Sequence, residues 1–208
     1  MRQNRTRIVG IVALVCCVLA PGLQAQGLTA TAQTMALPDE LQAGIKAAIG
    51  AATSAKVVIG STTLELWWGA PTAASWEALA EGTVIGAIRV TGAYRDIRGK
   101  VVKAGVYTLR YALQPQNGDH LGAAPNREFL LLSPAAVDVD PKPLGFDGTV
   151  ALAKQTTGTS HPASLSIDPP SSTDAPLTTY TTDPELKGVV FKAGSLTFGL
   201  ILSGRIEH

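Results

Sequence analysis

Apolar and polar residues alternate with a period of two along most of this chain, which is the period of half-buried β-strands. In Thr62–Trp68 the alternation places Leu64, Leu66 and Trp68 on one face and leaves Trp67 on the other. We therefore expect the first three side chains in the core and Trp67 facing outward.

Similar short segments, separated by Gly, Pro, Asn and Asp, follow along the chain, and the continuous apolar run Phe129–Leu132 indicates a strand buried on both faces. This spacing is typical of a sandwich or a barrel. We predict a mainly β fold, a single-domain antiparallel β-sandwich. The other predicted strands are Lys56–Ile59, Val84–Thr91, Ile97–Leu113 (with turn points at 99–100 and 104–105), Ala163–Ile167, Thr178–Thr181, Val189–Phe191 and Leu196–Ser203.

Two or three short peripheral helices accompany these strands. Asp39 is the predicted cap of a helix that places Leu41, Ile45 and Ile49 on one face and stops at Gly50. Residues 71–82 predict a helical excursion with Trp76 and Leu79 inside, and 147–156 a helix that Asp147 caps and that closes before Gly158.

Arg110 interrupts the clearest strand signal, because it lies on the face opposite Tyr107, Leu109 and Tyr111. We expect its side chain to reach solvent or to pair with Asp96 or Glu128. The cluster Asp138, Asp140 and Asp147 lacks the register of a calcium loop, so we interpret it as a solvated turn.

The N-terminus has the three parts of a secretory signal peptide. Arg2, Arg5 and Arg7 form a basic region, Ile8–Ala20 an apolar core and Leu23–Ala25 a small-residue cleavage site. We expect residues 1–25 to be removed on export to the periplasm or beyond, 26–36 to be a flexible leader and 37–208 to be the folded domain. A lipid anchor on Cys16 or Cys17 is the alternative, although bulky residues precede both.

Removal of the signal peptide changes the net charge and the cysteine content of the protein. The mature part has 17 − 3 = 14 basic and 16 acidic residues, a balance of −2, so we expect no nucleic-acid partner. Both cysteines leave with the signal peptide, which excludes a thiol nucleophile or a disulfide. We expect no stable membrane span after cleavage and a soluble product.

The longest polar loop, Gln114–Glu128, joins two predicted strands, and loops on a rigid sheet often carry function. A second polar loop contains His161. Two imidazoles and a carboxylate, His120, His161 and Asp119, suit zinc or copper(II), but no HxH or HExxH spacing is present. The candidate ligand-binding residues are Asn117, Asp119, His120, Arg127, Glu128 and His161.

Motifs of nucleophilic catalysis are missing from the sequence. Ser160 is next to His161, but sequence neighbours seldom point at one another and no GxSxG elbow is present. This argues for a non-enzymatic role.

The segments 99–141 (GKVVKAGVYTLRYALQPQNGDHLGAAPNREFLLLSPAAVDVDP) and 159–167 (TSHPASLSI), with LELWW and LTFGLILSG, resemble a group of exported bacterial proteins of unknown function. The K-A-G-x-Y-x-L turn and strand are similar to those of a secreted domain-of-unknown-function family. The resemblance implies a secreted, mostly β fold and supplies no activity.

Together these features predict an exported binding or interaction module of the cell envelope, with a small ligand or an envelope protein as partner. The alternative is a metal-binding protein or metal-dependent hydrolase that uses His120, His161 and Asp119. If the loops 114–128 and 157–162 meet, that end of the fold is the expected site.

Overall fold

The computed structural model describes residues 27–115, 126–168, 175–182 and 185–206. The predicted signal peptide, 1–25, therefore lies outside the described residues, as do the candidate residues Asn117, Asp119 and His120.

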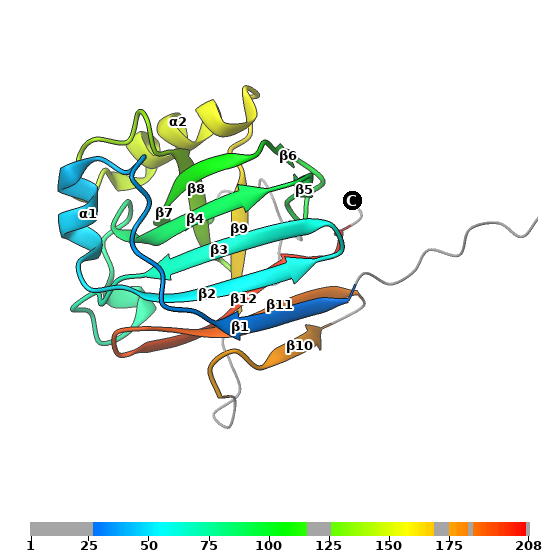
Figure 1. Ribbon diagram of the computed structural model, residues 1–208. Coiled ribbons are helices and arrows are strands. Elements are labelled where there is room, and N and C mark those ends of the chain that lie inside the picture. The colour runs from blue at the N-terminus through cyan, green and yellow to red at the C-terminus, as the bar shows by residue number, and fades with distance from the viewer. Residues whose placement is uncertain (1–26, 116–125, 169–174, 183–184, 207–208) are drawn as a thin grey trace, which may run out of the picture.

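One curved antiparallel sheet forms the body of the molecule, and its ten strands follow the order β1-β2-β3-β4-β7-β8-β9-β12-β11-β10 (Figure 1). A small separate sheet pairs β5 with β6. The strands are β1 (Leu28–Ala32), β2 (Thr53–Ile59), β3 (Thr62–Trp68), β4 (Val84–Thr91), β5 (Tyr94–Arg95), β6 (Val101–Val102), β7 (Gly105–Leu113), β8 (Glu128–Pro134), β9 (Ser164–Asp168), β10 (Thr179–Thr182), β11 (Leu186–Ala193) and β12 (Leu196–Ser203).

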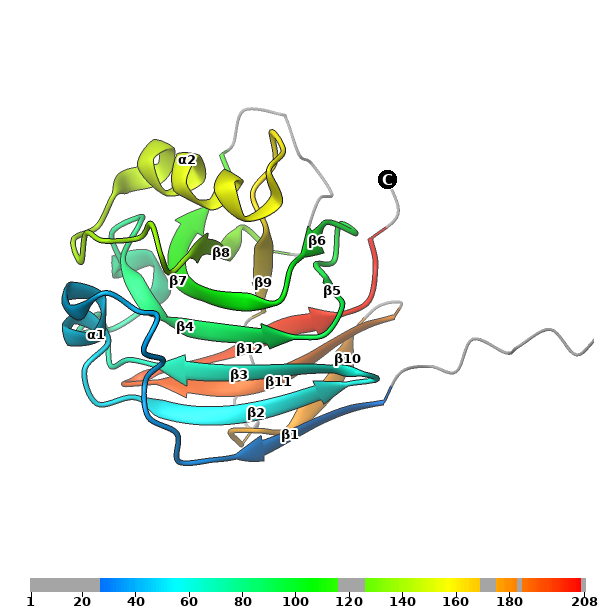
Figure 2. The same ribbon diagram turned by 45° about the horizontal axis from the view of Figure 1, so that its top comes forward.

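The predicted mainly β, antiparallel fold is confirmed, but the predicted sandwich is wrong, because the sheet curls into a nearly closed barrel (Figure 2). Strand β9 causes this difference: it pairs with β8 through Phe129–Leu131 and with β12 through Gly199 and Leu200. Strand β9 therefore joins into one continuous sheet the strands that a sandwich would keep in two separate sheets. The end strands β1 and β10 come into contact across the remaining seam.

The helices lie outside the barrel, as expected. The helix α1 spans Ala43–Ile49, buries Ile45 and Ile49 and ends at Gly50, but its N-cap is Gln42 rather than Asp39. The helix α2 spans Gly145–Thr157 and ends at Gly158, with Leu144 rather than Asp147 at the N-cap. The excursion 71–82 forms only a 3-10 turn, η1 (Trp76–Ala78).

The barrel interior is filled by apolar side chains from nearly all of the large strands. The ring centroid of Trp68 lies 5.1 Å from those of Phe191 and Phe198, and the ring centroid of Trp76 lies 5.0 Å from that of Phe198. Trp68 therefore belongs to the core as predicted, whereas Trp76 is partly buried and packs against it. Burial raises the pKa of Tyr94 and Tyr107, and burial together with the charge of Glu128 raises that of Tyr111 to about 12. These tyrosines stay protonated at neutral pH.

Trp67 does point away from the barrel interior, but the prediction that it faces outward is wrong, because its side chain is only 1% exposed. Residues of α1, including Ile45 and Ile49, cover it in a second apolar cluster. Its indole Nε1 donates a hydrogen bond to the carbonyl of Met35 at 3.3 Å. Residues 28–32 of the predicted leader likewise belong to the fold, since they form β1, which pairs with β2 from Leu28 to Ala32.

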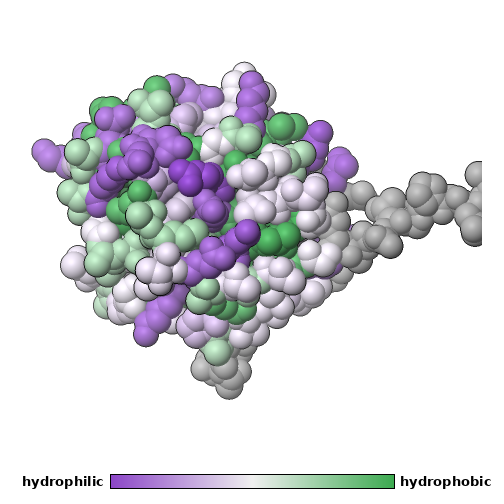
Figure 3. Space-filling view, viewed as in Figure 1, coloured by the Kyte–Doolittle hydropathy of each residue, from purple (hydrophilic) through white to green (hydrophobic). Residues whose placement is uncertain are grey.

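The face seen in Figure 3 is of mixed polarity, with hydrophilic side chains over α1 and the adjoining loops and with small, separate apolar areas. Within the described ranges, no helix is long and apolar enough to cross a bilayer.

Candidate ligand-binding site

A cavity of about 340 Å³ lies between α2 and the outer face of β7 and β8. Its walls are largely apolar: Ala112, Leu113, Phe129, Leu131, Phe146 and Val150 line it. The barrel interior is filled by the main core, so this space lies on the outside of the sheet, under the helix.

Strand alternation and helix docking together build these walls. Along β8, Leu130 and Leu132 belong to the barrel core, and their neighbours Phe129 and Leu131 therefore point outward toward α2. The helix is held by Ala153, which packs with Leu131, and by Thr156, whose Oγ1 donates to the carbonyl of Leu132 at 2.6 Å.

One side of α2 supplies the opposite wall. Phe146, Val150 and Lys154 follow one another at four-residue intervals, so they lie along one stripe of the helix and all line the cavity. The cavity wall thus ends in a cation at the C-terminal turn of α2.

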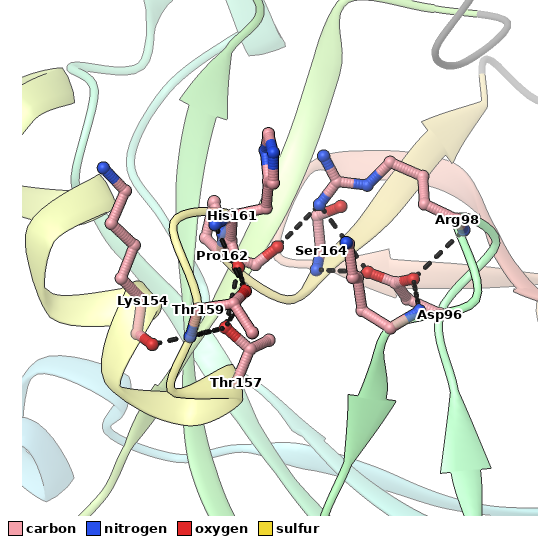
Figure 4. Close-up of polar contacts among 9 residues, drawn as sticks. Asp96, Arg98, Lys154, Thr157, Thr159, His161, Pro162 and Ser164 are labelled. Carbon is pink, nitrogen blue, oxygen red and sulfur yellow. Dashed lines mark hydrogen bonds and ion pairs between the residues drawn. The ribbon is translucent and has the colours of Figure 1, made fainter. Parts of the chain in front are cut away.

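The polar side of the cavity contains Arg98, Lys154, Ser160, His161 and Ser164, and no Asp or Glu is among its lining residues in the described part of the chain. In Figure 4 the guanidinium of Arg98 lies beside Ser164, whereas the side chain of Lys154 extends from α2 on the other side of His161. Basic groups therefore border an otherwise apolar space.

A buried carboxylate, Asp96, holds Arg98 in this position. One oxygen of Asp96 accepts hydrogen bonds from the backbone N–H of Arg98 at 3.0 Å and of Lys100 at 2.8 Å. Its other oxygen accepts from the backbone N–H of Ser164 at 3.4 Å and lies 3.6 Å from Nη2 of Arg98. Nη2 also donates to the carbonyl of Pro162 at 2.6 Å, which fixes the β5–β6 turn against the start of β9 (Figure 4).

Two polar groups beside this network lack a partner in the described residues: the hydroxyl of Ser164, which is 2% exposed, and Nε of Arg98. A buried group without a hydrogen bond costs about 1–3 kcal/mol of stability. Ser133 and Ser166 on the same face of the sheet also have unpartnered hydroxyls, but neither lines the cavity.

Hydrogen bonds within the loop after α2 fix the backbone that carries His161. Its carbonyl accepts from Oγ1 of Thr157 at 2.7 Å and from Oγ1 of Thr159 at 3.0 Å (Figure 4). His161 lines the cavity from this loop, so the loop forms a fixed part of the cavity rim.

The two polar loops meet here as far as the structure describes them, because Gln114 and Pro115 of one line the same cavity as Ser160–Pro162 of the other. Of the predicted ligand-binding residues, His161 lines this cavity. Arg127 instead donates to the carbonyl of Gln114 at 3.1 Å, and Glu128 opens β8 outside the lining. Asn117, Asp119 and His120 are outside the described residues.

The zinc or copper hypothesis can be compared with the structure only in part, because His120 and Asp119 are not described. In the described ranges, no group of three His, Cys, Asp or Glu side chains is placed to hold a metal ion. The metal site stays a prediction.

Comparison with known proteins adds no relative to this picture. No family model, curated protein or solved structure matches this chain. The site therefore has to be interpreted from its own geometry and chemistry.

Sequence reasoning missed Arg98, Lys154 and Ser164, along with the apolar walls. One signal was present: the stripe Phe146, Val150 and Lys154 at four-residue spacing, an apolar side of α2 that ends in a cation. Arg98 and Ser164 had no such signal, because they are 66 residues apart in the sequence and are brought together in the fold by the hydrogen bonds of Asp96 and Pro162.

Proposed function

We propose that this protein is an exported, non-enzymatic binding protein that holds a small, largely apolar molecule between α2 and β7–β8. The observation that carries the proposal is the apolar cavity itself. Its volume of about 340 Å³ falls in the range of small-molecule sites, about 300–1,000 Å³. The N-terminal signal sequence supports export.

The architecture supports binding on this outer face. Strand β8 is paired with β7 along its whole length, from Tyr107–Pro134 to Leu113–Glu128, and the two strands form a rigid floor. The helix α2 is attached to that floor at Ala153 and Thr156, neither of which lines the cavity, and Val150 of the cavity stripe packs against the same apolar cluster as Ala153. A ligand in the cavity can therefore leave the contacts of Ala153 and Thr156 in place.

The test is to fill the cavity with a side chain. Val150→Trp places an indole where the ligand would lie, and Val139→Trp is the matched control, because Val139 is 63% exposed and does not line the cavity. Binding of 1-octanol and of octanoate is followed by calorimetry and by NMR shifts of Leu131 and Val150 methyl groups. Wild type and V139W are expected to bind at least one probe, and V150W to bind neither.

Circular dichroism and urea unfolding establish that V150W is folded; if it is not, the smaller Val150→Phe takes its place. The proposal is overturned if wild type binds neither probe at millimolar concentration. It is also overturned if binding to the folded V150W or V150F is as tight as to wild type.

A further inference from the structure

We infer that the ligand of this cavity is an anionic amphiphile, an apolar chain or ring that ends in a carboxylate, with Arg98 and Ser164 at the carboxylate and Lys154 as a second cation in the cavity lining. The inference rests on the proposed function and adds the chemical class of the ligand. It follows from the charges and from the unused hydrogen-bond donors on the polar side of the cavity.

The charge of the lining favours an anion. Arg98 and Lys154 are both lining residues, and no carboxylate lines the cavity in the described part of the chain. Asp96 offsets part of the charge of Arg98, but its oxygens already accept three backbone hydrogen bonds as well as the guanidinium. Lys154 forms no ion pair with any described residue.

Hydrogen bonding points to the same ligand class. The hydroxyl of Ser164 and Nε of Arg98 both lack a described partner, and both residues line the cavity. Carboxylate oxygens accept charge-assisted bonds from arginine and ordinary bonds from a hydroxyl. Unpartnered serine hydroxyls also occur at Ser133 and Ser166, so the hydroxyl alone is not decisive. What distinguishes Ser164 is that it lines the cavity and lies beside the guanidinium of Arg98.

The apolar walls make a simple inorganic anion a poor ligand for this cavity. Phe129, Leu131 and Val150 offer no donor to a second charged end, and burying a charge against them is costly. A molecule with one anionic end and one apolar end satisfies both halves of the cavity. A cationic amphiphile of the same shape would be repelled by Arg98 and Lys154.

The experiment compares three probes of equal chain length, octanoate, 1-octanol and octylamine, by calorimetry at low and at high salt. Wild type is expected to bind octanoate about tenfold more tightly than 1-octanol, since bonds to a charged group are the stronger ones, and octylamine most weakly. The preference for octanoate should shrink as salt rises, because salt screens exposed charges.

Matched variants assign the effect to residues. Lys154→Met keeps the length of the side chain and removes its charge; Lys192→Met is its control, because Lys192 is an exposed residue of β11 that does not line the cavity. Ser164→Ala removes the unpartnered hydroxyl, and Ser166→Ala is the control on the same strand. K154M and S164A are each expected to weaken octanoate binding several-fold, with K154M leaving 1-octanol binding within about twofold, and K192M and S166A to change neither.

The outcomes separate this inference from the proposed function. Equal affinities for octanoate and 1-octanol, or tighter binding of octylamine, would overturn the anionic ligand and leave the binding cavity standing. The same holds if K154M and S164A bind octanoate as wild type does. Binding of none of the three probes would overturn both.

Discussion

Arg110 and Asp138 form an ion pair whose two side chains are both fully buried. Asp138 accepts from Nε of Arg110 at 2.8 Å and from Nη2 at 2.6 Å, and Thr108 donates to the same carboxylate. Nη1 of Arg110 donates to the carbonyls of Gly82 at 2.6 Å and Lys142 at 3.0 Å. A single side chain thus ties the loop 138–142 to the outer face of β7.

We expect Asp138→Asn to destabilise the protein by about 3–5 kcal/mol, because it leaves a buried guanidinium without its counter-charge. Urea unfolding measures the change. Asp140→Asn is the control: Asp140 is exposed, and Arg110 uses only its backbone carbonyl. A D138N protein as stable as D140N would contradict a structural role for the pair.

At the scale of single residues, the sequence identified which positions are special better than it identified their partners. It singled out Arg110 on the face opposite the tyrosines, but the predicted partners Asp96 and Glu128 are wrong, and Asp138 is no solvated turn at 1% exposure. The partner depends on where the loop after β8 crosses the sheet. That path is a long-range property, which residue type does not determine.

Glycine decides how two of the strands pack at the scale of elements. Strand β4 has a register shift between Val84 and Gly86 where it pairs with β7, which is the mark of a β-bulge. A Cβ atom at Gly86 would overlap the carbonyl oxygen of Trp67 on β3. Only glycine allows β3 and β4 to approach this closely.

Gly86→Ala is expected to cost about 3 kcal/mol of stability, since the backbone of β3 would have to move. Gly105→Ala is the matched control in β7, where the added Cβ would lie 3.4 Å from the Tyr107 side chain and the backbone is extended. The change there should stay within about 1 kcal/mol. Thermal unfolding of both variants compares them, and equal melting temperatures would refute the close approach.

The elements themselves were largely predictable from local pattern. The ranges Thr62–Trp68, Val84–Thr91 and Leu196–Ser203 match β3, β4 and β12. Gly50 and Gly158 do end α1 and α2. The failure at 71–82 has a local reason too: Pro71 and Gly82 bound a stretch too short and too weakly periodic to hold more than the turn η1.

For the whole molecule, the N-terminal sequence predicts a processed product that begins at Gln26, two residues before β1. Expression in a Gram-negative bacterium, followed by N-terminal sequencing and intact mass, checks this, and the mature protein should contain no thiol. Ala25→Leu, which enlarges the small residue at the cleavage site, is expected to slow processing; the exposed Ala36→Leu, beyond it, should not. A product that starts at Met1 or at a lipid-modified Cys17 would contradict the signal peptide.

The sequence by itself determined the strand segments, the two helix ends and the mainly β class. The signals for these features are the alternation of apolar and polar residues, the glycines that end helices and the Gly, Pro, Asn and Asp residues between strands, and each of them acts within a few residues. Only the tertiary structure decided that the sheet curls into a barrel, since the pairing of β9 with both β8 and β12 is long-range. It also decided that a helix stripe, a turn arginine and a strand serine border one cavity. Such a site depends on how distant elements pack, and the hydrophobic pattern fixes which side of an element is buried but not what lies against it.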